Sequence, residues 1–142
     1  MSDNPNKVPV FIVSACLIGI NTRYDGGNSL NKNIVSLFKK GVVIPLCPET
    51  LGGLGIPRPK ATIKNDSVIN EKGLDVTRYF YNGANVFLSF VTKLNPDCIY
   101  LKEHSPSCGV NSTSINWVRQ KGCGITTKLL KKEGCKNIKG ID

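Results

Sequence analysis

The sequence predicts an α/β fold, a Rossmann-like three-layer domain with a mostly parallel sheet and helices on both faces. Two observations carry this prediction. Short apolar segments rich in β-branched residues alternate along the chain with helical segments, and such segments are typical of strands buried on both faces of a parallel sheet. The strand–helix–strand order also implies right-handed crossovers, which place helices on either side of the sheet.

Four segments are the predicted strands of this sheet. Val8–Ser14 (VPVFIVS) is short, apolar and β-branched, as a fully buried strand should be. Val42–Leu46 (VVIPL) has the same character, and its proline indicates the strand end. Asp97–Leu101 (DCIYL) is the third strand, and we expect Cys135–Ile138 to form the last one.

Two helices are predicted between these strands. Asn31–Lys40 places apolar residues on one face, and Gly41 supplies a stop. Thr77–Leu94 is the longest helical segment, and Asp75 is a suitable cap. Its broad apolar stripe consists of Tyr79, Phe80, Val86, Phe87, Phe90, Val91 and Leu94.

The remaining segments are predicted as loops, a strand pair and a last helix. Residues 47–63 are rich in proline and glycine and should be loop, and residues 62–70 are expected to form a short strand pair or an excursion. Residues 102–113 are predicted as a polar loop. Gly124–Glu133 is the last helix, with Thr126 as its expected cap.

Length and composition indicate an ordinary globular domain. The chain has 142 residues, enough for one domain with one core, which we place at residues 8–142. Residues 1–7 are polar and are expected to be a loose N-terminus without a signal-peptide core. No apolar run reaches the roughly 18 residues of a membrane span. We therefore expect a soluble, cytoplasmic protein with no membrane partner.

The chain carries a formal net charge of +9, and much of the excess lies late in the sequence. This charge would attract a phosphorylated small molecule or RNA, or would simply form a solvated helix face. Aromatic residues do not alternate with the basic ones, so no single-strand binding groove, and no nucleic acid polymer as partner, is expected. The late basic residues are Arg119, Lys121, Lys128, Lys131, Lys132, Lys136 and Lys139.

Six cysteines are the most informative feature of the composition. Disulfides are disfavoured in a reducing compartment, so metal binding or catalysis is the better interpretation. Cys16, Cys47 and Cys108 each follow a predicted strand. Because ligands of parallel sheets bind beyond the carboxyl ends of the strands, these three thiols should converge on one rim.

The other three cysteines differ in their surroundings. Cys98 and Cys135 fall in predicted strands, where a free cysteine packs as a small hydrophobe. Cys123 lies between two glycines and is the remaining candidate for a fourth ligand. No Cys-x-x-Cys occurs, which argues against a zinc ribbon or a ferredoxin-like run. Three ligands would leave one coordination position open, as in catalytic metal sites; the alternative is a set of buried, inert thiols.

An ordered set of short motifs resembles the DUF523 family, whose studied members are thiouracil desulfidases. The resemblance runs from about Val10 to Gly134, nearly the whole chain. The motifs are Val13–Gly19, Arg23–Gly26, Cys47–Glu49, Gly52–Leu54, Pro57–Pro59, Gly73–Thr77 and Leu101–Gly109. Two departures stand out. Thr22 occupies a position where the family often has a cysteine, and residues 111–116 lack the Tyr-Asp-Gly expected downstream.

This resemblance implies a [4Fe-4S] cluster held by Cys16, Cys47 and Cys108, with one iron not ligated by the protein. The open iron would take the sulfur of a thiolated uracil base, nucleoside or nucleotide, such as 4-thiouracil, 4-thiouridine or 4-thio-UMP. The reaction is non-redox: C=S becomes C=O, and hydrosulfide leaves by way of the cluster. An oligomer is compatible with this assignment.

The chemistry needs a base that takes a proton from the attacking water. Glu49, two residues after a cluster ligand, is the candidate base; alternatively it pairs with Arg58. Ser105 is the candidate donor to the ring carbonyl or to the water. Ser107 is a candidate for the same role or for a bond to the loop backbone.

Further contacts with base, ribose or phosphate are expected from other motif residues. The candidates are Ser14, Arg23, Asp25, Arg58 and Lys102. Asp25-Gly26 is equally well explained as a plain turn. The glycines at 52, 53 and 55 would let the backbone approach a ligand closely, and His104 is expected to be exposed.

Other functions for an open-iron cluster are dehydration, sulfur transfer in tRNA or nucleotide thiolation, and non-enzymatic redox sensing or cluster transfer. Thiolation normally needs an ATP site or an RNA-binding module, and the sequence shows neither. A carrier would expose its cysteines in a flexible loop, whereas these cysteines follow buried strands. Desulfidation is therefore preferred.

Overall fold

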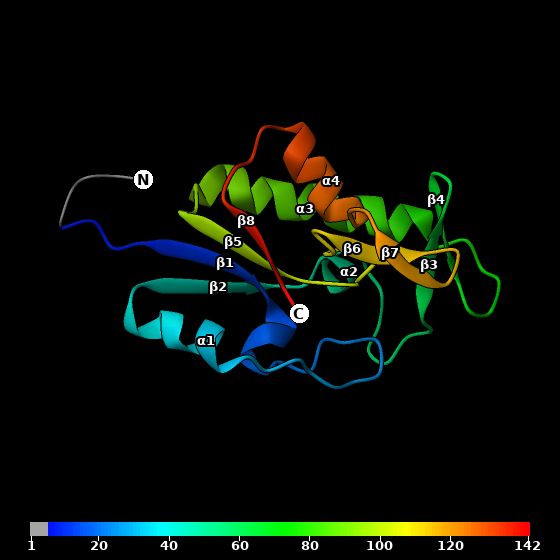
Figure 1. Ribbon diagram of the computed structural model, residues 1–142, viewed down its shortest axis with the longest axis horizontal. Coiled ribbons are helices and arrows are strands. Elements are labelled where there is room, and N and C mark those ends of the chain that lie inside the picture. Colours follow the sequence, from blue (N-terminus) through cyan, green and yellow to red (C-terminus); the bar gives the residue numbers. More distant parts are fainter. Residues whose placement is uncertain (1–5) are drawn as a thin grey trace.

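The computed structural model describes residues 6–142, which form two four-stranded sheets joined by one long helix (Figure 1). Most of the predicted loose N-terminus, residues 1–5, lies outside the described residues. Within residues 6–142, every helix is too short or too polar to cross a membrane.

The first sheet is entirely parallel and has the strand order β2-β1-β5-β8. Its strands are β1 (Val10–Ser14), β2 (Val42–Leu46), β5 (Cys98–Lys102) and β8 (Ile138–Ile141). The α/β fold and the three apolar core strands are therefore confirmed. The predicted last strand was placed three residues too early. Gly134 and Asn137 both have positive φ, so the chain turns there before β8 begins.

Helices cover both faces of this sheet, as the three-layer prediction required (Figure 1). On one face Phe11 and Val13 pack with the short helices η1 (Ala15–Ile18), α1 (Lys32–Val35) and η2 (Ser36–Lys39). On the other face Ile12 packs under α3 (Thr77–Leu94) and α4 (Ile125–Lys132). Alternate residues of β1 point to opposite faces, which is why residues 10–13 are all apolar.

The second sheet is mixed and has the order β4-β3-β6-β7. Its strands are β3 (Ala61–Lys64), β4 (Ser67–Asn70), β6 (Ser112–Ile115) and β7 (Val118–Lys121). The β3–β4 hairpin confirms the strand pair expected within residues 62–70. The β6–β7 hairpin was not predicted. Every residue of β7 is exposed, so this strand lacks the apolar alternation that would reveal it in the sequence.

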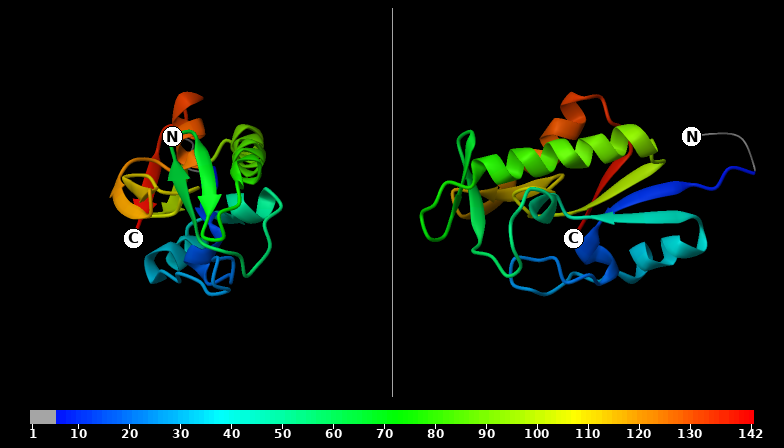
Figure 2. Two further views of the ribbon diagram at one scale, coloured as in Figure 1. Left: turned by 90° about the vertical axis from the view of Figure 1, so that its right-hand side faces the viewer. Right: turned by 180° about the vertical axis from the view of Figure 1, so that it is seen from behind.

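α3 packs against both sheets and holds them together (Figure 2). Its first half, with Phe80 and Ala84, contacts the second sheet, and its second half, with Phe87 and Val91, contacts the first. Three residues of the predicted apolar stripe, at positions 86, 90 and 94, are instead exposed. The small residues Gly83 and Ala84 complete the buried face of α3. The Asp75 carboxylate accepts a hydrogen bond from the Thr77 N–H, as a capping residue should.

Three local predictions need correction. The helix expected over residues 31–40 is divided into α1 and η2, and Asn31 caps it by accepting from two backbone N–H groups. Residues 47–63 are not all loop, because α2 (Pro48–Leu51) begins directly after Cys47. Gly124, not Thr126, is the N-cap of α4. Thr126 lies inside this helix, and its hydroxyl is buried without a partner among the described residues.

Candidate active site

A cavity of about 340 Å³ lies at the carboxyl ends of β1, β2 and β5. Cys16, Cys47 and Cys108 all line it. Cys16 is in η1 directly after β1, Cys47 is the N-cap of α2 directly after β2, and Cys108 is in the loop after β5. The structure therefore brings together the three thiols that the sequence placed on one rim. All six cysteines are free thiols.

These three thiols suit an iron–sulfur cluster better than a single metal ion. In residues 6–142, no three His, Cys, Asp or Glu side chains could together hold one ion. In a cluster the thiolates bind different irons, so three thiols that line one cavity can serve as its ligands. Burial and the neighbouring Cys47 raise the pKa of Cys16, and burial raises the pKa of Cys108. Any metal bound through these thiols would therefore displace their protons.

The loop that carries Cys108 is fixed by the first turn of α4. The backbone N–H groups of Ile125 and Thr126 donate to the carbonyls of Pro106 and Ser107, both at 2.9 Å. The Thr127 hydroxyl donates to the Cys108 carbonyl, also at 2.9 Å. The loop carbonyls thus accept from N–H groups that lack partners within the helix. As a result, the position of Cys108 is set by a helix that lies beyond it in the sequence.

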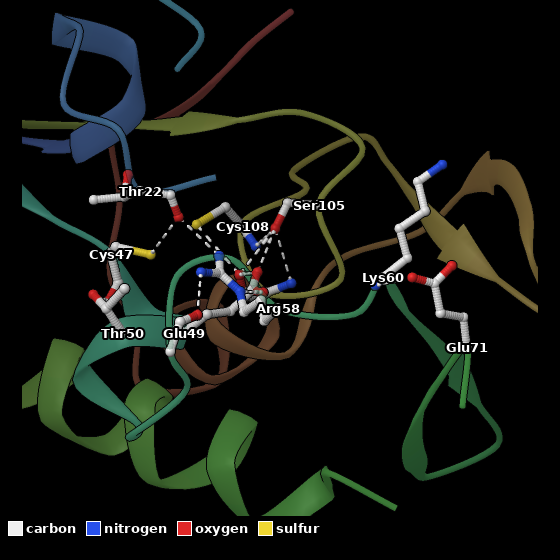
Figure 3. A network of polar contacts seen from close by, with 11 residues as sticks. Thr22, Cys47, Glu49, Thr50, Arg58, Lys60, Glu71, Ser105 and Cys108 are labelled. Atoms are coloured by element: carbon white, nitrogen blue, oxygen red, sulfur yellow. Dashed lines mark hydrogen bonds and ion pairs between the residues drawn. The ribbon is translucent and has the colours of Figure 1, made fainter. Parts of the chain in front are cut away.

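Glu49 lies at the centre of a polar network next to Cys108 (Figure 3). Its Oε2 accepts from Ser107 Oγ at 2.7 Å and from Ser105 Oγ at 3.4 Å. Its Oε1 accepts from Arg58 Nε at 3.0 Å, and the two side chains of this ion pair are only 12% and 7% exposed. The pairing with Arg58 that the sequence left as an alternative is therefore present, and one carboxylate oxygen still faces the serines.

Ser105 and Ser107 have distinct positions in this network. The Ser105 hydroxyl oxygen accepts from the backbone N–H groups of Ser107 and Cys108 at 3.1 and 3.0 Å. It therefore also shapes the cysteine loop, as in a local serine turn. The Ser107 hydroxyl is buried, makes the shorter contact with Glu49 and lies 3.7 Å from Cys108 Sγ.

Close packing of two glycines places Glu49 in the cavity. A Cβ atom on Gly52 would collide with the Tyr79 carbonyl, and one on Gly83 would collide with the Pro48 carbonyl. The short helix α2 therefore rests directly on the backbone of α3. Gly52, Gly53 and Gly55, which we expected to let the backbone approach a ligand, lie outside the cavity lining.

Most of the other predicted contacts reach the cavity. Ser14, Arg23, Arg58 and Lys102 line it. The Ser14 hydroxyl accepts from the Lys102 N–H at 3.0 Å and so ties β5 to β1. Asp25 lies outside the lining, where it accepts from the Gly27 N–H and pairs with Arg23. The plain-turn interpretation of Asp25-Gly26 is therefore the one that the geometry supports.

His104 is not exposed, contrary to expectation. Its ring nitrogens lie 3.0 Å from Ser112 Oγ and 2.9 Å from Asp142 Oδ1, and its side chain is 20% exposed at the cavity wall. The strand β6, which the sequence did not reveal, supplies its partner Ser112.

Several lining residues were missed by sequence reasoning. Among them are Tyr24 and Lys60 from the loops before β3, and Trp117 and Arg119 from the β6–β7 hairpin. Of the seven late basic residues, Arg119 is the one that lines the cavity. Two-residue hairpin turns are usually recognised in a sequence by Asn-Gly or Asp-Gly. Here the turn is Asn116-Trp117, so the sequence gives no such signal for the hairpin.

Glu103 is a buried carboxylate of the cavity lining that holds the chain just after Cys108. It accepts from the N–H groups of Val110 at 2.7 Å and Asn111 at 3.0 Å, and from the Asn111 side chain at 2.8 Å. Burial alone would raise the pKa of Glu103. The hydrogen bonds from residues 110–112 outweigh burial and hold this pKa below its ordinary value of 4.5.

Glu103→Gln should lower the free energy of unfolding by about 1–3 kcal/mol at pH 7, because buried N–H groups lose a charged acceptor. A depressed folded-state pKa contributes stability above the unfolded pKa, and this stability is lost as the pH falls through the folded pKa. The difference between the two proteins, measured by urea unfolding, should therefore shrink below about pH 4. The exposed Glu71→Gln is the control, and an equal difference at pH 7 and pH 3 would contradict this role.

Comparisons with known proteins agree with this site. A family model described as 2-thiouracil desulfurase matches residues 11–140. The chain is similar to a solved structure of the [4Fe-4S]-dependent thiouracil desulfidase TudS (DUF523Vcz), at 36% identity and a TM-score of 0.85, over 93% of this chain and 90% of that one. The uncharacterized protein YbbK of Bacillus subtilis (strain 168) is 32% identical over 142 residues, which is 91% of this chain and 94% of YbbK. The DUF523 resemblance is thereby confirmed, and the chain belongs to the 2-thiouracil desulfurase family.

Proposed function

We propose that this protein removes sulfur from thiolated uracil compounds, converting C=S to C=O with release of hydrosulfide. The candidate substrates are 4-thiouracil, 4-thiouridine and 4-thio-UMP. The observation that carries the proposal is the convergence of three cysteines from three strand ends on one cavity that also holds Glu49 and two serines. Family membership and the similarity to TudS support the same activity.

Cys16, Cys47 and Cys108 would hold a [4Fe-4S] cluster through three of its irons. When bound, the cluster would supply an iron with an open position, a Lewis acid suited to the soft sulfur of a thiocarbonyl. The fit rests on the donor set: three free thiols that line one cavity. Cys123 lies outside this lining, and its thiol donates to the Val110 carbonyl at 3.3 Å.

The residues beside the thiols would handle the protons of the reaction. Water forms the new C–O bond and the C–S bond breaks, so no electrons are gained or lost overall. Glu49 would take a proton from the attacking water through its Oε2, directly or by way of the Ser107 hydroxyl at 2.7 Å. The Arg58 contact holds Oε1, so the carboxylate keeps one orientation. Ser105 and Ser107 would donate to the ring carbonyl or position the water.

The direct test is turnover by the cluster-loaded protein. The protein is purified without oxygen, iron and sulfide are reconstituted, and 4-thiouracil or 4-thio-UMP is added. We expect the thione absorbance to disappear while uracil or UMP and hydrosulfide appear in equal amounts. Full cluster occupancy without turnover of either compound would refute the proposal.

The same assay separates desulfidation from the alternatives. When uracil or UMP, sulfide and ATP replace the thiolated compound, a thiolating enzyme would consume sulfide and generate thione absorbance. A redox sensor or cluster carrier would lose or change its cluster without consuming any thiolated compound. The buried positions of Cys16 and Cys108 favour the enzyme, because a carrier must expose its cluster to a partner.

A further inference from the structure

We infer that His104 is a positioning residue for the proposed reaction. The side chains of Asp142 and Ser112 hold its imidazole, and the imidazole holds the backbone turn that directs the Ser105 hydroxyl toward Glu49. His104, Asp142 and Ser112 together form the His104 clamp. The inference rests on the proposed function and deepens it, because it assigns how the candidate hydroxyl donor of that reaction is kept in place.

The backbone of His104 is the first observation. Its φ is 71°, a left-handed conformation that residues other than glycine adopt uncommonly. Its N–H donates to the Ser112 carbonyl at 3.0 Å, and the N–H of Glu103 before it donates to the Ile141 carbonyl at 2.8 Å. Such strain persists where the surroundings determine the conformation, and it concentrates at functional sites. A change in φ at this residue would rotate the peptide group that leads directly into Ser105.

The imidazole of His104 is held at both nitrogens. Nδ1 lies 3.0 Å from Ser112 Oγ, and Nε2 lies 2.9 Å from Asp142 Oδ1. A carboxylate only accepts, so Nε2–H donates to it. Nδ1 accepts from the Ser112 hydroxyl when the ring is neutral and donates to the hydroxyl oxygen when the ring is protonated. Both contacts persist in either form, and a ring with both nitrogens occupied serves as an anchor and not as the acid or base of the reaction.

These two contacts join the two sheets immediately before Ser105. Ser112 belongs to β6 of the second sheet, whereas Asp142 directly follows β8 of the first. His104 also forms an isolated bridge with Thr113, and the Thr113 hydroxyl donates to the Ser105 carbonyl at 2.8 Å. The chain is therefore fixed on both sides of the peptide bond between residues 104 and 105.

Ser105 depends on this support because its contact with Glu49 is long. Its Oγ lies 3.4 Å from Glu49 Oε2, near the largest separation at which a hydrogen bond is effective. The same oxygen accepts from the N–H groups of Ser107 and Cys108, so the hydroxyl cannot turn to compensate for a displaced backbone. A misplacement of about 1 Å at a reacting group can lower a rate about 10²-fold.

His104→Ala should lower kcat for 4-thiouracil about ten- to a hundredfold, with KM changed less than about twofold and all iron retained. Alanine lacks the ring and disfavours positive φ. His104→Gly also lacks the ring, but glycine adopts positive φ freely, so this variant should retain clearly more activity than His104→Ala. Wild-type kcat in His104→Ala would overturn the inference. Equal losses in the two variants would do so as well, because the ring would then not act through the backbone.

Asn65→Ala is the matched control for this pair. Asn65 also has positive φ, 55°, but it lies in the turn between β3 and β4, outside the cavity lining. The variant introduces the same backbone strain, so its melting temperature should fall as that of His104→Ala does, while kcat stays unchanged. A loss of kcat equal to that in His104→Ala would trace the effect to lower stability and refute the positioning role.

Variants of Asp142 test the clamp from a side chain that is 80% exposed and can be replaced without straining the fold. Asp142 Oδ1 also lies 3.8 Å from Lys102 Nζ, so its charge is a second route to the cavity. Asp142→Asn keeps an oxygen that can accept from His104 Nε2–H but loses the charge, whereas Asp142→Ala loses both. We expect kcat to fall in Asp142→Ala and to be largely retained in Asp142→Asn. Equal losses would assign the effect to the charge near Lys102 and overturn the inference.

The single histidine of the chain makes the clamp observable without turnover. In the isotope-labelled, cluster-loaded protein, the Nε2–H of His104 should give a nuclear magnetic resonance signal that exchanges slowly with water, because it is hydrogen-bonded. Asp142→Ala should lose this signal and Asp142→Asn should keep it. Its absence from the wild type would overturn the inference. If the signal is present but the wild type desulfurates no thiolated uracil compound, the proposed function fails and the clamp itself stands. If the wild type and His104→Ala desulfurate 4-thiouracil equally fast, the inference fails and the proposed function stands.

Discussion

Cys108→Ser is expected to abolish the four-iron cluster and, with it, all desulfuration. Cys108 is buried in the cavity wall, and its loop is held by the first turn of α4. The loop cannot move to offer another donor, and a serine hydroxyl is a poor replacement for a soft thiolate. Iron and acid-labile sulfide analysis, together with the visible absorbance of the reconstituted protein, measures the loss. Cys16→Ser and Cys47→Ser should have the same effect.

Cys123→Ser is the matched control for this set. Its thiol lies outside the cavity lining and contacts the Val110 carbonyl and the Lys131 ammonium. We expect this variant to retain full iron content and activity. Thermal unfolding of each apo variant separates loss of the cluster from loss of the fold. Four irons retained after removal of any one of the three cavity thiols, or lost on removal of Cys123, would show that the ligand set is wrong.

Glu49→Gln is expected to lower kcat by about 10²–10⁴-fold, the usual contribution of a general base, while the cluster stays in place. Glutamine has the size of glutamate. Its amide oxygen can still accept from Arg58, and its amide nitrogen can donate to the Ser107 hydroxyl oxygen, so the side chain should keep its place in the network. It cannot take a proton from water. Iron content and kcat for 4-thio-UMP, measured on the same preparation, give the result.

Two further variants test whether the Glu49 carboxylate acts as the base. Glu49→Asp keeps the charge but shortens the reach toward Ser107, so it should retain more activity than Glu49→Gln. Glu133→Gln removes an exposed carboxylate at the end of α4 and should leave kcat unchanged. Should Glu49→Gln keep wild-type kcat, the base must be another group. Loss of iron in this variant would instead assign Glu49 a purely structural role.

Much of the first sheet was predictable because its signal is local. β1, β2 and β5 consist almost entirely of apolar residues, apart from Ser14 and Lys102 at the carboxyl ends of β1 and β5, because both faces of the sheet are covered. This composition can be read directly from the sequence. The β6–β7 hairpin has no such signal. Its outer strand is fully exposed, and its turn carries Trp117 where glycine is usual. Because the hairpin was not predicted, its cavity-lining residues Trp117 and Arg119 were not predicted as site residues either.

The sequence by itself determined that Cys16, Cys47 and Cys108 each follow a strand. It also identified Glu49 and Ser105 as the acid–base candidates. These follow from chain order, because parallel strands bring their carboxyl ends to one edge. Only the tertiary structure decided which groups face one another there. It paired Glu49 with Arg58 and Ser107, moved Asp25 out of the site and brought Trp117 and Arg119 to the cavity. Such contacts join residues up to 58 positions apart, and they depend on how helices and hairpins pack, which no local pattern encodes.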